Sequence, residues 1–190
     1  MKKALSGFTV VELIVVIVII GILASITLVS YGGMQARTRN AQTVTSANQW
    51  LKTLKMYQSR NGGYPTMSTC LGEGYKYAAN NQGNSGVGMC RQLTSTLGVV
   101  TDAPTVAALS KYSSTSQSPA MVSAVNGSSD WHRGVYYYIN GTTATFNFVL
   151  DGKGASECPN PFANIALSQE IKATNGNIAC TYLLGPVTGY

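Results

Sequence analysis

Residues 1–31 read MKKALSGFTVVELIVVIVIIGILASITLVSY, and this stretch decides the architecture of the chain. The 24 residues from Leu13 to Ala36 carry no charge, and most of those up to Val29 are Ile, Val or Leu. As a helix they would extend for roughly 36 Å, enough to cross a hydrocarbon core of about 30 Å. We therefore predict a membrane-spanning helix near the N-terminus.

One acidic residue, Glu12, lies at the start of this apolar run. A carboxylate near the middle of a bilayer costs on the order of 3 kcal/mol on insertion scales, so a glutamate in this setting is a functional candidate. The alternative is that Glu12 simply reaches back to the headgroups. Small residues precede the run, at Ser6 and Gly7, whereas a secretory signal carries them after a shorter apolar core.

Four cysteines lie far beyond the apolar run and lack the spacing of zinc ligands. An even number is typical of disulfides formed in an oxidising compartment, and four free thiols are the alternative. Four cysteines allow three sets of two disulfides. We predict the set that joins nearest neighbours in the sequence, Cys70 to Cys90 and Cys158 to Cys180. Because the basic residues flanking the run nearly balance, the cysteines decide the orientation, with the N-terminus in the cytoplasm.

The segment KKALSGFTVVE, followed by LIVVIVIIGILASI, resembles the class III signal peptide and N-terminal helix of type IV pilins and their relatives. The resemblance rests on the short basic leader, on Gly7 and Phe8, and on Glu12 as the fifth residue after Gly7. It extends to about Thr66 and implies that a prepilin peptidase cuts after Gly7 and methylates the new N-terminal Phe8. Many pilins also have a proline late in this helix, but here none precedes Pro65.

Cleavage would create an amine on Phe8, with a reference pKa near 8, at the edge of the apolar run. Glu12 could pair with this cation on its own chain or on a neighbouring copy. Between copies, such a pair would set the axial offset of the helices, much as one polar residue fixes the register of a coiled coil. We therefore expect Glu12 to be an assembly residue.

A second helical pattern follows the glycine pair Gly32-Gly33. Apolar and small residues recur at spacings of three and four, which predicts an amphipathic helix over 32–61 that continues the apolar helix of 8–31. The segment Asn61-Gly62-Gly63 predicts the helix end. We expect this stripe to pack under a sheet, with Trp50 and Tyr57 at its margins, and it comprises Ala41, Val44, Ala47, Leu51 and Leu54.

The remaining residues, 62–190, are expected to form the head. We interpret 62–133 as a long connection with one short helix at about 104–111, 134–150 as a β-hairpin, and 151–190 as a disulfide-closed loop with a strand at about 178–184. With residues 1–7 as the leader, the predicted fold class is α+β, in which a long N-terminal helix packs on a small antiparallel sheet.

The hairpin prediction rests on Asn140-Gly141, a type I′ turn signal between two β-rich runs. A two-residue turn there would pair Ile139 with Thr142 and Val135 with Phe146. One face of the hairpin would then cover the helix. The other face, which includes Tyr136 and Tyr138, would be solvated or would meet a neighbour.

The sequence offers little for an enzyme, and we expect no catalytic residues, no cofactor and no metal. His132 is the only histidine, and we interpret it as a loop residue. Asp151 and Glu157 are too few oxygen ligands for calcium. The formal net charge of +6 comes from scattered residues, so a nucleic-acid site is weakly supported.

The resemblance implies a structural subunit of a type IV pilus for adhesion, motility or DNA uptake. Its partners would be other copies in a helical homopolymer, the prepilin peptidase, the inner-membrane assembly machinery, the membrane before assembly, and a surface, DNA or glycan ligand. It would be a single-pass protein of the cytoplasmic membrane and then part of an extracellular filament. The alternatives are a pseudopilin of a type II secretion system and a minor tip pilin that binds DNA or glycan.

Overall fold

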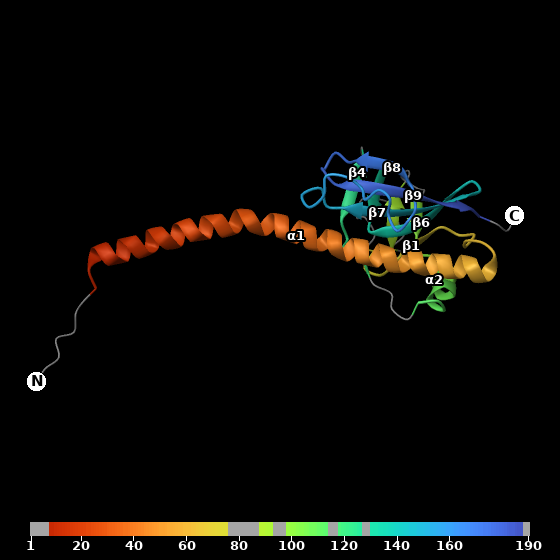
Figure 1. Cartoon of the computed structure of the whole chain (residues 1–190), viewed down its shortest axis with the longest axis horizontal. Coiled ribbons are helices and arrows are strands. Elements are labelled where there is room, and N and C mark those ends of the chain that lie inside the picture. The colour runs from red at the N-terminus through yellow and green to blue at the C-terminus, as the bar shows by residue number, and fades with distance from the viewer. Residues whose placement is uncertain (1–7, 76–87, 93–97, 114–117, 127–129, 188–190) are drawn as a thin grey trace, which may run out of the picture.

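The computed structural model describes residues 8–75, 88–92, 98–113, 118–126 and 130–187. One long helix leads into a head of two antiparallel sheets and a short second helix, an α+β architecture as predicted (Figure 1). The elements are α1 (Val10–Asn61), β1 (Thr69–Leu71), β2 (Met89–Gln92), β3 (Gly98–Val100), α2 (Ala103–Ser110), β4 (Ser123–Asn126), β5 (Asp130–Arg133), β6 (Val135–Asn140), β7 (Thr143–Leu150), β8 (Leu167–Lys172) and β9 (Ile178–Pro186).

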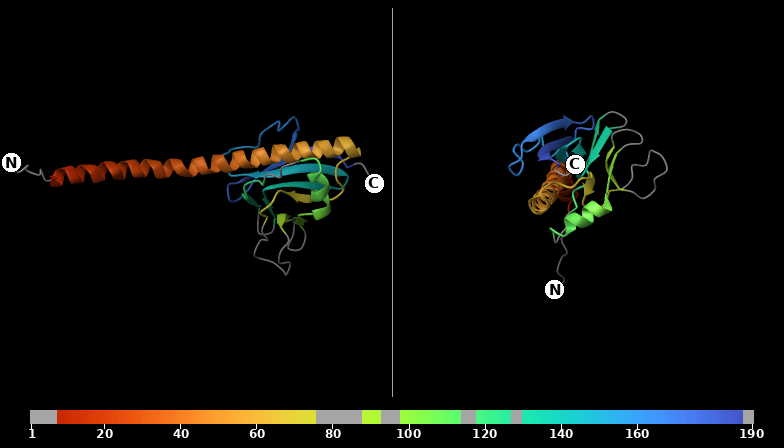
Figure 2. Two further views of the ribbon diagram at one scale, coloured as in Figure 1. Left: turned by 90° about the horizontal axis from the view of Figure 1, so that it is seen from below. Right: turned by 90° about the vertical axis from the view of Figure 1, so that its right-hand side faces the viewer.

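Helix α1 is continuous over 52 residues, and its N-terminal part projects far from the head (Figures 1 and 2). It ends at the predicted place. Gly62 has a φ of 77°, and its N–H donates to the carbonyl of Gln58 at 2.9 Å. A left-handed glycine of this kind closes the last turn and directs the chain back toward the sheet.

The larger sheet has five strands in the order β1-β6-β7-β9-β8, and α1 packs across one face of it. Strand β9 was expected, whereas β8 was not. The predicted inner face of the hairpin is confirmed, because its residues join the core beneath α1. These residues are Val135, Tyr137, Ala144, Phe146, Phe148 and Leu150, with Ile139 partly buried beside them.

The hairpin register differs from the prediction by two residues. Asn140 pairs with Thr143 and Ile139 with Ala144, so the turn residues are Gly141 and Thr142. Gly141 has a φ of 60°, and glycine at the first of two central positions is typical of a type II′ turn. Because side chains alternate with a period of two, a shift of two residues leaves every side chain on its predicted face.

The buried side of α1 is displaced slightly from the predicted stripe. Ala47, Leu51 and Leu54 are buried as expected, but Ala41 is exposed and Trp50 is buried instead of marginal. The reason is that the buried residues recur at spacings of three and four from Ala36, which leaves Ala41 one position outside that row. The row itself is Ala36, Asn40, Thr43, Ala47, Trp50 and Leu54.

The expectation of a long connection over 62–133 is wrong. This region forms β1, α2 and a second sheet of four short strands in the order β3-β2-β5-β4. The second sheet covers the outer face of the hairpin only in part, because Tyr136 is buried there whereas Tyr138 and Thr145 stay partly exposed. Burial raises the pKa of Tyr75, which lies between the layers and accepts a hydrogen bond from the Val135 N–H at 2.9 Å.

Candidate assembly surface on the N-terminal helix

The first half of α1 exposes nearly all of its apolar side chains. From Phe8 to Ile26, each large apolar side chain is between 45% and 83% exposed. Soluble monomers rarely expose contiguous apolar patches of this extent, so the surface indicates an interaction site. Within the described residues, none of the helices is long and apolar enough to cross a bilayer. The exposed residues are Phe8, Val10, Val11, Leu13, Ile14, Val15, Val16, Ile17, Val18, Ile19, Ile20, Ile22, Leu23 and Ile26.

Glu12 lies in the first turn of α1 and closes a capping box with Thr9. Its carboxylate accepts hydrogen bonds from the Thr9 backbone N–H at 2.8 Å and from the Thr9 hydroxyl at 2.7 Å. The Glu12 backbone N–H in turn donates to the Thr9 hydroxyl oxygen at 3.3 Å. These contacts satisfy two backbone N–H groups at the helix start.

The capping box adds a role for Glu12 that the sequence interpretation missed, although Thr-Val-Val-Glu matches its signature. The expected partner of Glu12 was the amine of Phe8. In the full chain the Phe8 nitrogen is a peptide nitrogen, and Glu12 is instead bound to the next residue, Thr9. Gly7 and the rest of the leader lie outside the described residues.

A buried contact fixes α1 where it leaves the head. The Asn40 side chain donates to the Asp151 carbonyl at 2.9 Å and accepts from the Asp151 N–H at 2.7 Å. Arg39 forms an ion pair with the Asp151 carboxylate at 3.4 Å. The same loop passes so close to α1 that a Cβ on Gly154 would lie 2.7 Å from the helix backbone. No local pattern could have predicted this contact, because its partners are 111 residues apart.

Both cross-links of the structure join the pairs expected from the sequence. Cys70–Cys90 connects β1 of the larger sheet to β2 of the smaller one. Cys158–Cys180 connects the loop after β7 to β9. The first therefore joins the two sheets, and the second closes the C-terminal loop over the helix-facing core.

His132, which the sequence analysis considered for a catalytic or metal-binding role, packs among other residues of the head. His132 is buried in β5, so its interpretation as a loop residue is wrong. Its Nδ1 is in hydrogen-bond contact with the hydroxyl of Tyr136, and the two rings are stacked at 5.9 Å. Over the described ranges, no three His, Cys, Asp or Glu side chains are grouped to hold a metal ion.

Comparison with known proteins places the similarity at the N-terminus. Residues 2–28 match the family model of the prokaryotic N-terminal methylation motif, a range that includes Gly7, Phe8 and Glu12. Over 65 residues, or 34% of this chain and 46% of the relative, the sequence is 38% identical to the type II secretion system core protein G of Aeromonas hydrophila.

Two fimbrial proteins are similar over 72 residues, or 38% of this chain. The protein EcpC of Eikenella corrodens is 35% identical with 47% of its length covered, and that of Neisseria meningitidis is 32% identical with 42% covered. The chain thus spans less than half the length of the curated relatives it matches. No solved structure matches it. The relatives are named as fimbrial proteins and as a type II secretion system protein, and the matched methylation motif lies in the part of the chain that carries the exposed helix.

Proposed function

We propose that this chain, which is type IV pilin-like in its N-terminal part, is a structural subunit of a type IV pilus. The observation that carries the proposal is the contrast along α1. Its second half is buried in the head, whereas its first half offers an apolar surface that the same copy does not cover. A filament would bury this surface against other copies.

Processing precedes assembly in this proposal. The prepilin peptidase cuts after Gly7 and methylates Phe8, and residues 8–31 hold the subunit in the cytoplasmic membrane with its head on the oxidising side. The long uncharged run supports the membrane step, and the two disulfides support the location of the head. Residues 1–7 serve only as the leader, while 32–61 connect the membrane segment to the head.

Assembly then exchanges lipid contacts for helix contacts. In lipid, the Glu12 carboxylate carries a penalty on the order of 3 kcal/mol, which its hydrogen bonds to Thr9 reduce. In a bundle, Glu12 would meet the Phe8 amine of a neighbouring copy and gain a charge-assisted hydrogen bond. This pairing favours one axial offset between copies, because the apolar side chains alone would tolerate several.

The direct test is electron microscopy of filaments sheared from cells that express the chain, combined with mass spectrometry of their main component. The expected N-terminal peptide begins with N-methylated Phe8 and lacks residues 1–7. A surface filament in which the chain is absent, or a mature protein that retains the leader, would contradict the proposal.

A pseudopilin of a type II secretion system is the second candidate, favoured by the similarity to core protein G of Aeromonas hydrophila and of Dickeya chrysanthemi. The two functions share the exposed helix but differ in phenotype. Deleting the gene of a pilus subunit should remove surface filaments and leave protein secretion intact. Deleting that of a pseudopilin should abolish secretion of exported enzymes and leave surface filaments unchanged.

A further inference from the structure

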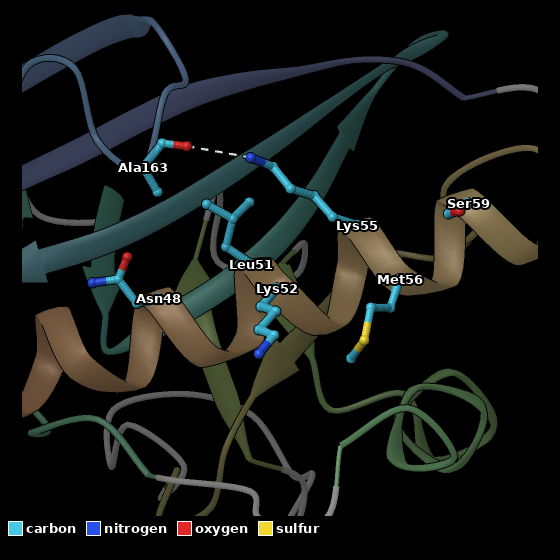
Figure 3. Close-up of a pocket in the computed structure, with 7 residues that line it drawn as sticks. All are labelled: Asn48, Leu51, Lys52, Lys55, Met56, Ser59 and Ala163. Carbon is cyan, nitrogen blue, oxygen red and sulfur yellow. Dashed lines mark hydrogen bonds between the residues drawn. The ribbon is translucent and has the colours of Figure 1, made fainter.

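A groove runs along one side of α1 in the head, between the helix and the turn formed by residues 162–165 (Figure 3). It has a volume of about 360 Å³, with Leu51 and Met56 as its apolar lining. The Lys55 ammonium donates to the Ala163 carbonyl at 3.2 Å, while Lys52 points away from that turn. We call Lys52 and Lys55, together with this groove, the lysine flank.

Beyond Glu12, the charge on α1 is of one sign. Between Glu12 and Glu73 the sequence contains five basic residues and no acidic one. Arg39 is paired with Asp151, but no carboxylate among the described residues lies within ion-pair distance of Lys52 or Lys55. Both lysines are exposed. The lysine flank is therefore a cationic surface that its own copy leaves unneutralised.

An acidic residue, Glu73, is linked to α1 through Ser118. The Gln42 side chain donates to the Ser118 carbonyl at 3.2 Å, and the Ser118 hydroxyl accepts from the Glu73 N–H at 3.0 Å. Glu73 is exposed, and its carboxylate forms no ion pair within the described part of the chain. We call Glu73 and Ser118 the acidic flank. Viewed along its axis, α1 lies between the strands β8 and β9 on one side and α2 on the other (Figure 2).

We infer that the lysine flank of one copy docks on the acidic flank of a second copy, with Glu73 of one copy paired to Lys52 and Lys55 of the other. The inference rests on the proposed function. Copies that bundle through the first half of α1 would carry the second half of the same continuous helix alongside a neighbouring head. The flanks are different surfaces of the head, so the contact is heterologous and repeats from copy to copy, as a filament requires.

Charge complementarity favours a second copy as the occupant of the groove. Each copy supplies one lysine flank and one acidic flank, and neither forms an ion pair within the described part of its own copy, so each contact in a polymer would join one of each. Opposite charges across an interface fix its register and exclude wrong arrangements, and like charges placed together are strongly unfavourable. The docking would thus set the rotation of each head about the filament axis.

A charge swap in the full chain tests the inference. Lys52→Glu should reduce the yield of sheared filaments by about tenfold or more, since it places two carboxylates together at every interface. Glu73→Lys should have the same effect, and the double variant should restore the yield to within about twofold of the wild type. The matched control is Lys153→Glu, which makes the same change on an exposed lysine of the loop after β7 and should assemble normally. Immunoblots of processed protein in the membrane separate lost assembly from lost folding.

A cross-link provides the second readout. Lys52→Cys combined with Glu73→Cys should give a ladder of disulfide-linked oligomers in sheared filaments, whereas each single cysteine variant should give none. If both charge reversals assemble like the wild type, or if the double variant is no better than the singles, the docking is wrong while the proposed filament stands. A ladder from Lys52→Cys with Glu157→Cys instead would also overturn it. If the wild-type chain forms no filaments at all, the proposed function fails and the docking fails with it.

Discussion

The two halves of α1 are the same secondary structure with opposite surroundings. Residues 10–26 are dominated by Val, Ile and Leu and are exposed, whereas residues 36–54 contribute Ala, Asn, Thr and Trp to a closed core. The more apolar half is thus the one left open. In the head, small side chains such as Ala47 and large ones such as Trp50 and Leu54 both pack against the sheet, whereas the large β-branched side chains of residues 10–26 are left exposed.

The largest effect on filament assembly should come from a substitution in the exposed half of α1, residues 10–26. Glu12→Ala should give processed protein that stays in the membrane with few or no filaments, because insertion depends on the apolar run and cleavage on Gly7. Immunoblots of membranes and electron microscopy of sheared material measure the two steps separately. Gly7→Val should accumulate uncut precursor instead.

Two controls separate the charge of Glu12 from its capping role. Glu12→Gln keeps an oxygen that can accept from Thr9 but removes the charge, so it should assemble as poorly as Glu12→Ala. Thr9→Ala removes the capping box and keeps the carboxylate, so it should still form filaments. Normal filaments from Glu12→Ala together with lost cleavage would make the carboxylate part of the peptidase signal.

The buried half of α1, residues 36–54, should instead determine the stability of the head. A fragment beginning at Thr38 should fold as a monomer, because the second half of α1 and the hairpin bury each other. Within it, Leu54→Ala should lower the free energy of unfolding by about 2 to 5 kcal/mol, since Leu54 is fully buried. Denaturant titration measures this loss. In the full chain, Ile17→Ala should leave the unfolding of the head unchanged, and a matching loss there would mean that the two halves are not independent.

The hairpin turn should show a smaller effect of the same kind. Gly141→Val places a β-branched residue at a φ of 60° and should destabilise the head by about 1 to 3 kcal/mol. Thermal unfolding of the fragment beginning at Thr38 measures the effect, with Thr142→Val as the control at the neighbouring turn position. An unchanged melting temperature for Gly141→Val would count against the turn.

The smallest effect should be a gain in stability. Ala163 and Asn164 form a tight turn in which both residues have positive φ, 47° and 64°. Ala163→Gly should relieve this strain and raise the free energy of unfolding by up to about 1 kcal/mol. The same denaturant titration detects it, and a loss of stability would show that the methyl group of Ala163 contributes more than its backbone strain costs.

The sequence predicted those features that neighbouring residues determine. Local signals were sufficient for the end of α1 at Gly62, the faces of the hairpin and the position of α2. The hairpin register was wrong because Asn140-Gly141 and Gly141-Thr142 are both acceptable turns, and alternation alone cannot distinguish registers two residues apart. A strong turn signal therefore located the hairpin without fixing its pairing.

The missed features lack a local pattern. The strands of the second sheet have three or four residues each, too few for alternation to be recognised. At the assembly surface, Glu12 was identified through its position in the apolar run, but its bond to Thr9 was overlooked. The contact of Asn40 with Asp151 arises only when loop and helix meet in the folded chain.

The two disulfides have a mechanical consequence for a chain that is pulled along its long helix. Tension applied through α1 reaches the head first at Ala36 and can extend the chain only as far as its cross-links allow. The two loops closed by Cys70–Cys90 and Cys158–Cys180 have sequence separations of 20 and 22. At about 3.3 Å per residue, the residues inside these loops would add roughly 140 Å to the extended chain, and the disulfides prevent that extension. A subunit under load would therefore yield only part of its contour length, and its second sheet would stay tied to the first.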